Sequence, residues 1–510
     1  MKSIYRKCIY LFSLSLLLFT SCQDMLDEVP LDFINQKQFF KNEAQCEAAA
    51  NGCYGPLNSI FNQTLLIPLE ACSDLAYLDN KSYEDVSFSL SPASPGNGKS
   101  LWSSLYYAIR LCNGNYDGIL RADIDEKKKG QYMAEIAFLR GLYYYTLTST
   151  FGDIPFYTDD VCSLEILKKV SALPRMSASE TRDSLIGDLS RLIEYLPKRV
   201  PAQNYSRIPR QAAHMLIAKM AMWNKDYALA FEHLTEIRLI YGHLSQYSLE
   251  DTKFSEKNKP ESIFEVQYTY SATGLRKTSS TACYFTPYKN EKDKAVYDGL
   301  TIPYLGTKAS PFTSLRPSKN LIELYEAVKA ELSPEAEGID PRSRIIMGYG
   351  YKNEEFNSVK NGNKPWMGPK FWCPGMDNMS DGNNQKVFRF ADALLMLAEC
   401  ANELGKQDLA LECLKEVRQR ALYGMFFENR DPEAIRKEIR DERARELMGE
   451  YGRRWDLVRW GIFYESIKNT TGTEIETIGK NIKPFHQYYP IPDTEVQRTN
   501  GILTNDAYNQ

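Results

Sequence analysis

The sequence predicts a mostly α-helical protein, in which tetratricopeptide-like helical hairpins form a scaffold around one long, irregular, loop-rich insertion that we expect to bind the ligand. Two observations predict this fold. Apolar residues recur at helical spacing through most of residues 36–245 and 387–467, and two stretches within them share one helix–turn–helix pattern. Between these parts, residues 246–385 are rich in Gly, Pro, Tyr, Asn and Lys, and long segments of this kind usually carry function.

The two similar stretches are residues 211–241 and 391–421. Each has a first helix, a short polar turn (Asn224-Lys225-Asp226 or Gly405-Lys406-Gln407) and a second helix. Small alanines stand where the paired helices would cross, and in such repeats each hairpin covers the apolar face of its neighbour. Because two copies do not make an array, we expect degenerate members at residues 101–150.

Three smaller features are also predicted. Phe151-Gly152-Asp153 resembles a helix end, because Gly can supply a positive φ and Pro155 prevents the helix from resuming. Ser262–Val266 is expected to be a short extended run, and the residues after about 467 are expected to form a non-helical tail.

The composition is that of an ordinary folded chain: 510 residues, 43% apolar and 25% charged. The formal charge of −4 excludes the basic footprint of a nucleic-acid-binding protein. Eleven cysteines occur without any Cys-x-x-Cys pattern, so we expect neither a disulfide framework nor a zinc site. We interpret nearly all of them as small buried apolar residues, with Cys22 as the exception, and we expect no cofactor and no metal.

Residues 1–21 resemble the signal peptide of a bacterial lipoprotein. A positive start precedes an apolar run, Ile9 to Phe19, that is too short to span a bilayer. The run ends in Leu18-Phe19-Thr20-Ser21-Cys22, which resembles a lipobox, so Cys22 is the predicted site of lipid attachment. A plain secretory signal with a nearby cleavage site is the alternative.

Residues 22–35 are predicted to form an acidic linker after the lipidated cysteine. Asp24, Asp27 and Glu28 resemble the surface-export signal of lipoproteins in some diderm bacteria. The predicted location is therefore the outer membrane, with the lipid-anchored protein facing the cell exterior.

A series of motifs follows in one order along nearly the whole chain. The most specific is Ala134–Tyr145 followed by Phe151-Gly152-Asp153-Ile154-Pro155. The others are Phe39-Phe40, Glu47–Tyr54, Trp102 with Tyr106 and Asn113, Pro174–Ser177, Asp340-Pro341-Arg342, Arg389–Glu399, Glu442–Leu447, Arg454–Gly461, Tyr489–Pro492 and Asn500. Together, behind a lipobox, they resemble the SusD/RagB family of nutrient-binding lipoproteins. Cys400 stands where the family usually has Ala, and the final segment, Asn505–Tyr508, matches loosely.

The resemblance implies one SusD-like domain over residues 36–510, with the helical scaffold at about 36–245 and 387–467 and the variable ligand-binding region at about 246–385. It also implies a cell-surface lipoprotein that captures an oligosaccharide and delivers it to a SusC-type TonB-dependent outer-membrane transporter. The implied partners are this transporter, a glycan ligand and the outer membrane, and no nucleic acid.

Candidate ligand-binding residues come from side-chain chemistry. A sugar ring lies flat on an aromatic side chain, while its hydroxyl groups bond to planar polar groups. Two loop regions, residues 74–99 and 284–372, have this mixture. The candidates are Tyr77, Asp79, Asn80, Tyr83, Tyr288, Tyr304, Trp366 and Trp372. For Trp366 and Trp372, packing against the helical scaffold is the alternative.

We predict no catalytic residues. The charged residues around Trp455 and Trp460 are expected to form a structural network; they are Arg443, Glu446, Arg453, Arg454 and Asp456. Gly-x-Ser-x-Gly, His-Glu-x-x-His and phosphate-loop patterns do not occur. The remaining alternatives are a peptide-binding member of the same family, a structural lipoprotein that docks protein partners, and a surface glycoside hydrolase, whose paired carboxylates a sequence cannot reveal.

Overall fold

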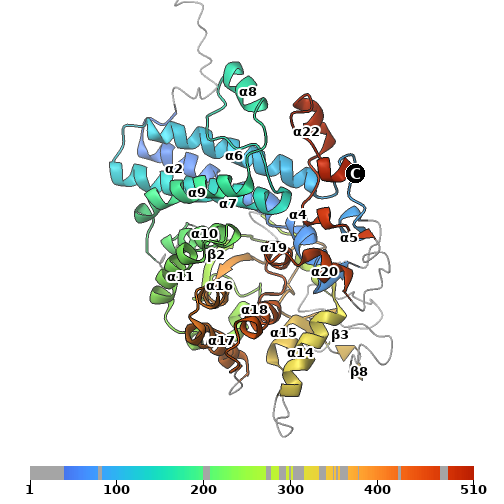
Figure 1. The fold of residues 1–510 in the computed structure, drawn as a ribbon. Coiled ribbons are helices and arrows are strands. Elements are labelled where there is room, and N and C mark those ends of the chain that lie inside the picture. The colour runs from blue at the N-terminus through green and yellow to red at the C-terminus, as the bar shows by residue number, and fades with distance from the viewer. Residues whose placement is uncertain are drawn as a thin grey trace, which may run out of the picture.

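The computed structural model describes residues 39–78, 83–198, 207–270, 277–286, 295–297, 300–301, 315–331, 340–348, 350–351, 354–355, 366–376, 378–422, 427–470 and 481–509. Helices dominate it, as the sequence predicts (Figure 1). The predicted signal peptide and linker lie outside the described residues. Within the described ranges, no helix is both long enough and apolar enough to cross a bilayer.

The scaffold is a row of helices that pack in succession. The order in space is α6 (Gly98–Leu120), α7 (Glu126–Phe151), α9 (Ala178–Leu192), α10 (Arg210–Trp223), α11 (Tyr227–Tyr241), α16 (Phe390–Glu403) and α17 (Gln407–Leu422). Both predicted hairpins are confirmed, as α10–α11 and α16–α17. The expected degenerate member at residues 101–150 is the α6–α7 pair. Because α11 packs directly on α16, the segment between them is an insertion into a continuous helical row.

Helix α7 packs against α6, α9 and α10. Every residue from Tyr132 to Phe151 is buried, so this part of the helix is enclosed on all sides. The helix begins at the Asp125 side chain, which accepts a hydrogen bond from the Lys128 N–H at 3.0 Å. It ends at Gly152, whose φ of 73° is a backbone conformation that glycine adopts readily and other residues rarely adopt. The predicted helix end is confirmed.

Further helices surround this row. They are α2 (Glu43–Gly52), α3 (Leu57–Ile60), α4 (Gln63–Leu66), the π-helix η2 (Ile67–Ala71), α5 (Glu84–Ser87), α8 (Leu164–Ser171), α12 (Ala282–Phe285), α18 (Pro432–Leu447), α19 (Arg453–Arg459), α20 (Phe463–Lys468) and α22 (Asp493–Arg498). Short 3-10 turns lie at η3 (Ile193–Tyr195), η4 (Leu244–Gln246), η5 (Leu249–Thr252), η6 (Pro484–Gln487) and η7 (Asp506–Asn509). The prediction of a non-helical tail after residue 467 is therefore wrong for η6, α22 and η7.

The insertion begins and ends at one place. Strand β2 (Ser262–Val266) pairs antiparallel with β10 (Gln385–Arg389), so Val266 lies opposite Gln385. The prediction of an extended run at residues 262–266 is confirmed. The insertion also contains α14 (Lys319–Glu331) and α15 (Pro341–Ile346), which the loop-rich expectation missed.

The other strands form short antiparallel pairs. These are β1 (Ala76–Leu78) with β5 (Leu315–Pro317), β3 (Ala295–Tyr297) with β4 (Leu300–Thr301), β6 (Met347–Gly348) with β9 (Trp366–Met367), and β7 (Gly350–Tyr351) with β8 (Glu354–Glu355). All of them except β1 belong to the insertion.

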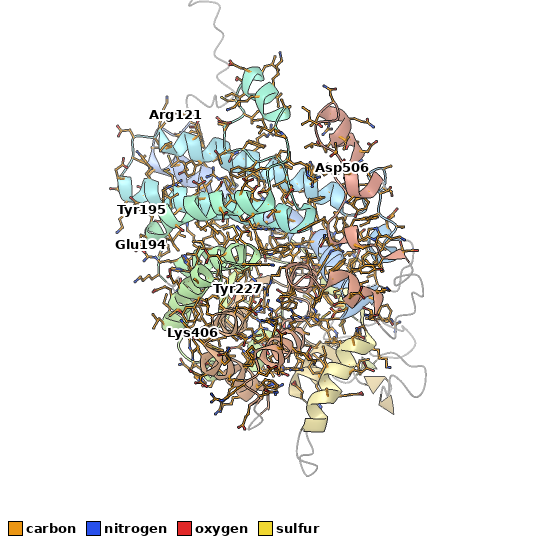
Figure 2. All side chains as sticks on the ribbon, in the orientation of Figure 1. Arg121, Glu194, Tyr195, Tyr227, Lys406 and Asp506 are labelled. Atoms are coloured by element: carbon orange, nitrogen blue, oxygen red, sulfur yellow. The ribbon has the colours of Figure 1, made fainter. Side chains whose placement is uncertain are left out.

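Most cysteines take the predicted role. Among the described residues, Cys46, Cys53, Cys72, Cys112, Cys283, Cys373, Cys400 and Cys413 are buried and unpaired. Cys162 is exposed instead, just before α8. Figure 2 shows the side chains of the described fold, in which Arg121, Glu194 and Lys406 are exposed. Many other charged side chains, such as Arg342 and Glu442, are buried.

Candidate functional site

The two loop regions with sugar-binding composition meet in space. Strand β1 belongs to the first region and β5 to the second, and the two pair antiparallel with Tyr77 opposite Arg316. Both α12 and β9 lie beside β5. We call this place the β1–β5 junction, formed by residues 74–78, 83–85, 282–286, 315–318 and 366–367. The junction brings together segments that are about 240 positions apart in the chain.

Polar contacts fix the junction to the scaffold. Asp74, just before β1, forms a two-pronged ion pair with Arg453 of α19, with both N–O distances 2.7 Å. The Ser318 hydroxyl donates to the Asp74 carbonyl at 2.7 Å, and the Ser318 N–H donates to Leu75 at 2.8 Å. These bonds hold the beginning of one loop region against the end of β5.

The far end of the first loop region is fastened by Asp85. Its carboxylate accepts from the Asn97 side chain at 3.0 Å and from the Tyr489 hydroxyl at 2.6 Å. Burial raises the pKa of Asp85, and these donors partly oppose that shift. Gly96 packs so closely on Asp85 that an added Cβ would lie 2.4 Å from the carboxylate.

Two tyrosines from the two regions touch at the junction. Tyr83, at the start of α5, is half-buried and is hydrogen-bonded to Tyr284 of α12. Burial and this bond raise the pKa of Tyr284, so the phenol stays protonated and serves as a donor at neutral pH. Phe285 next to it stacks on Phe371, with ring centroids 4.1 Å apart. Tyr83 thus lies at the junction as a half-buried residue whose partner, Tyr284, is buried.

The structure corrects two of the candidate residues. Tyr77 is 1% exposed and Trp372 is 3% exposed, so neither presents a ring face to a ligand. The Trp372 N–H donates to the Met367 carbonyl at 3.1 Å, which satisfies the indole inside the core. For Trp372 the alternative of packing against the scaffold is therefore the correct one. Their loop-like surroundings in the sequence concealed this burial.

The remaining candidates stay predictions. Tyr83 lies at the junction, as described above. Asp79, Asn80, Tyr288 and Tyr304 lie outside the described residues, and Trp366 is described only by its backbone in β9. Sequence reasoning missed Tyr284 as Tyr83's partner and Arg316 as the half-buried cation of the junction. Only the pairing of β1 with β5 reveals them.

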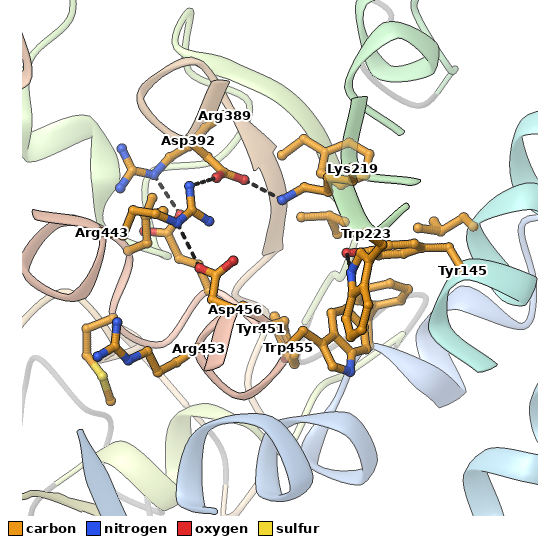
Figure 3. Close-up of a pocket in the computed structure, with 18 of the residues that line it drawn as sticks. Tyr145, Lys219, Trp223, Arg389, Asp392, Arg443, Tyr451, Arg453, Trp455 and Asp456 are labelled. Carbon is orange, nitrogen blue, oxygen red and sulfur yellow. Dashed lines mark hydrogen bonds and ion pairs between the residues drawn. The ribbon is translucent and has the colours of Figure 1, made fainter. Parts of the chain in front are cut away.

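A small polar cavity lies deeper, among α10, α16, α18 and α19 (Figure 3). Its volume is about 50 Å³, room for a few water molecules and far below the size of a usual ligand pocket. One side is aromatic, where the Trp223 indole donates to the Tyr145 hydroxyl at 3.3 Å. The other side carries an ion chain. We interpret this cavity as part of the scaffold.

The ion chain joins four helices, α10, α16, α18 and α19, through two carboxylates. Asp392 accepts from Lys219 at 2.7 Å and from Arg443 at 2.8 Å. Asp456 accepts from Arg443 at 2.7 Å and from Arg459 at 2.9 Å. Burial alone would raise the pKa of both acids, but the surrounding cations lower it. Both stay ionised at neutral pH and act only as acceptors, which does not suit a general acid.

The remaining members of the predicted charged network are also paired. Glu446 accepts from Arg389 at 2.8 Å and from Arg342 at 3.0 Å. Arg454 lies 4.6 Å from the ring centroid of Phe463. The Trp460 indole donates to Glu399 at 3.0 Å. Among the described residues, no cluster of three or more His, Cys, Asp or Glu side chains could hold a metal ion.

An open groove between α3 and β2 is a second polar surface. It has a volume of about 360 Å³, and its polar lining includes Asn51, Tyr54, Asn58, Arg207 and Gln267. The groove already uses much of its own bonding capacity, since Asn58 donates to the Gln267 carbonyl at 2.8 Å. Arg207 pairs with Glu135 at 2.7 Å. The sequence analysis did not single out this groove.

The fold defines a class: a helical-repeat protein whose row of helices is interrupted by one long insertion. Comparisons with known proteins agree with this class. The sequence model of the "SusD family" matches residues 260–508, and the model described as "Starch-binding associating with outer membrane" matches residues 74–222. The chain belongs to the SusD/RagB family.

Relatives and solved structures extend the match to nearly the whole chain. SusD-like protein P25 of Formosa agariphila is 27% identical, over 96% of each chain. Starch-binding protein SusD of Bacteroides thetaiotaomicron is 23% identical, over 81% of this chain and 80% of its own. A laminarin binding SusD-like protein has a TM-score of 0.69 at 22% identity, over 90% of this chain and 98% of its own. Surface glycan-binding protein A of Bacteroides thetaiotaomicron, solved with laminarihexaose, also has a TM-score of 0.69, at 20% identity over 91% and 99%.

Proposed function

We propose that the protein is a cell-surface lipoprotein that binds an oligosaccharide at the β1–β5 junction and delivers it to a SusC-type TonB-dependent transporter. Membership of the SusD/RagB family, several of whose members are named for starch or laminarin binding, supports the ligand class. The observation that carries the location is the meeting of the two loop regions at this junction.

The side chains at the junction suit a sugar. Tyr83 offers part of an aromatic face, on which the C–H face of a sugar ring can lie. Arg316 is half-buried in β5 and can supply a polar group at the junction, where sugar hydroxyl groups can both donate and accept. Ligand binding would favour a closed transporter complex to the extent that the ligand binds that state more tightly.

The binding test compares a tyrosine at the junction, Tyr83, with an exposed tyrosine outside it. We expect the purified protein to be retarded in gels that contain laminarin or starch, and Tyr83→Ala to weaken binding about tenfold, or about 1.4 kcal/mol. Tyr107→Ala is the matched control, because Tyr107 is 56% exposed on α6, outside the junction. Thermal unfolding should be unchanged in Tyr107→Ala and only slightly lowered in Tyr83→Ala, where the buried Tyr284 loses its hydrogen-bond partner.

Three results would contradict parts of this proposal. Loss of binding in Asn58→Ala, with Tyr83→Ala unaffected, would move the site to the groove between α3 and β2. Retention of peptides instead of glycans would favour a peptide-binding member of the family. New reducing ends after incubation with glycans would show catalysis and exclude a pure binding function.

Anchoring and delivery need separate tests. Radioactive palmitate should label the wild-type protein in cells, and Cys22→Ala should lose the label. The acylated protein should copurify with a TonB-dependent barrel from outer membranes. Recovery of unacylated wild-type protein from the cytosol would contradict the anchor, and a barrel-free preparation would contradict the delivery step.

A further inference from the structure

Helix α8 is amphipathic, yet none of its side chains is buried. Its apolar residues Leu164, Ile166, Leu167 and Val170 fall on one side, because they repeat at spacings of three and four. Leu164 is 67% exposed and Leu167 is 47% exposed. Isolated exposed leucines are ordinary, but a whole apolar helix face outside the core indicates an interaction surface.

The exposure is not a consequence of a loose attachment. The chain leaves the scaffold at Ile154 and returns at Met176, where the two residues exchange backbone hydrogen bonds of 3.1 and 2.8 Å. Tyr157 on the outgoing side stacks parallel to Tyr106 of α6, and its carbonyl accepts from the Tyr144 hydroxyl at 2.7 Å. The Ser163 side chain caps the helix by accepting from the Ile166 N–H. The base of the segment is therefore fixed, and α8 is presented outward.

Comparison with α22 shows that a helix can project from this molecule without having an apolar face. Helix α22 also stands out from the upper end of the molecule (Figure 1). Its sequence, DTEVQR, is polar except for Val496. The apolar face of α8 is thus a property of that helix.

Helix α8 lies at the same end of the molecule as the first described residues, which follow the predicted tether (Figure 1). The first described residues pack on α6, where the Phe40 ring covers Gly118. Helices α2, α6 and α8 lie at the same end of the molecule (Figure 1). The chain from Cys22 to Phe39 spans about 56 Å at most when extended, at ~3.3 Å per residue. A lipid at Cys22 can therefore hold this end of the molecule against a bilayer.

We infer that α8 lies on the surface of the membrane that holds the tether, with Leu164, Ile166, Leu167 and Val170 in the interfacial layer of the lipid. Lys168 borders Leu164 on the helix surface and can extend its ammonium group toward the headgroups. The helix is too short to bind a bilayer strongly by itself, but a tether gives it a high local lipid concentration. Together they fix the orientation of the protein.

Charge has a minor part in this contact. Asp159, Asp160 and Glu165 accompany the two lysines, and Lys169 already pairs with Asp159 at 3.2 Å. The segment has no excess of positive charge. We therefore expect the contact with zwitterionic phosphatidylcholine, which has no net charge, to be nearly as strong as that with anionic phosphatidylglycerol.

Cys162 allows a direct test, because it is exposed beside the Ser163 cap while the other described cysteines are buried. The acylated full-length protein, labelled at Cys162 with a fluorescent dye, is placed in phosphatidylcholine vesicles that contain a headgroup quencher. We expect strong quenching in the wild type. Leu164→Gln combined with Leu167→Gln should lower the fraction of molecules with α8 in contact with the lipid about tenfold or more, since each leucine loses its apolar contact, while the tether keeps the protein on the vesicle.

Leu239→Gln is the matched control, because Leu239 is 74% exposed on α11. It should leave the quenching unchanged, and all variants should keep the wild-type melting temperature. Absence of quenching in the tethered wild type would overturn the inference, as would equal quenching in the double variant. If the dye is shielded from solvent only when the barrel transporter is present, and the lipid quencher has no effect, the apolar face binds a protein partner. That result would also overturn the inference. None of these results depends on glycan binding.

Discussion

Asp74 and Arg453 lie 379 positions apart in the chain and form a buried two-pronged ion pair, with Nε–Oδ1 and Nη2–Oδ2 distances of 2.7 Å. The pair joins the segment before β1 to α19. It thereby connects the proposed ligand site with the charged helices of the scaffold.

A double-mutant cycle should measure this connection. Removing either partner leaves a largely buried charge, so Asp74→Ala or Arg453→Ala should each destabilise the fold by about 3 kcal/mol. The double variant should lose less than the sum, because the second change removes the stranded charge. Urea unfolding measures all four proteins. Strictly additive losses would contradict the coupling.

Arg453→Lys separates charge from geometry. Lysine keeps the positive charge but cannot reproduce the two parallel bonds. We expect a smaller loss of stability than in Arg453→Ala, with a measurable loss of glycan affinity because β1 shifts. Wild-type affinity in Arg453→Lys would show that the junction does not depend on this pair.

Glu70 should give stability an unusual dependence on pH. Burial raises its pKa to about 7, although the N–H groups of Gly449 and Gly452 bond to the carboxylate at 3.1 and 3.2 Å. The folded state then holds a proton that the unfolded state releases above its own pKa of about 4.3. This contribution to stability is present at low pH and is lost as pH rises through about 7.

Glu70→Gln should remove this dependence. Relative to the wild type, the variant should gain about 3 kcal/mol of unfolding free energy between about pH 4 and pH 8. Urea unfolding at several pH values measures the difference. A constant difference between the two proteins over this range would contradict the raised pKa.

Gly152 ends α7 in a conformation that other residues rarely adopt, with φ 73° and ψ −128°. A Cβ there would also lie 3.3 Å from the Tyr488 ring. Gly152→Ala should therefore destabilise the protein by about 1–3 kcal/mol, measured by thermal unfolding. Gly187→Ala in α9 is the matched control, because nothing lies within 4 Å of its added Cβ. It should stabilise slightly, and equal effects of the two changes would refute the conformational explanation.

Trp372 should behave as a core residue. Trp372→Ala removes a buried ring and leaves the Met367 carbonyl without its donor, so we expect a loss of about 3–5 kcal/mol. The folded fraction should still bind glycan with the affinity of the wild type. An unchanged melting temperature together with lost binding would restore Trp372 as a ligand-stacking residue.

The helical hairpins could be predicted from sequence because their information is local. Apolar spacing defines the buried faces of α10–α11 and α16–α17, and the Gly152–Pro155 segment can only end a helix. Family motifs spread along the chain then identify the scaffold as a whole. The predicted lipobox is likewise a local pattern, read directly from residues 18–22.

The burial of Tyr77 and Trp372 could not be predicted in this way. Both occur in segments that look like loops, and their burial depends on packing against residues that are distant in the chain, such as β5 beside Tyr77. The approach of Tyr83 to Tyr284 also depends on the pairing of β1 with β5. Sequence alone determined the helical frame and the kinds of residue available for binding. Tertiary structure decided which of those residues reach the surface, because burial depends on long-range packing that local spacing does not encode.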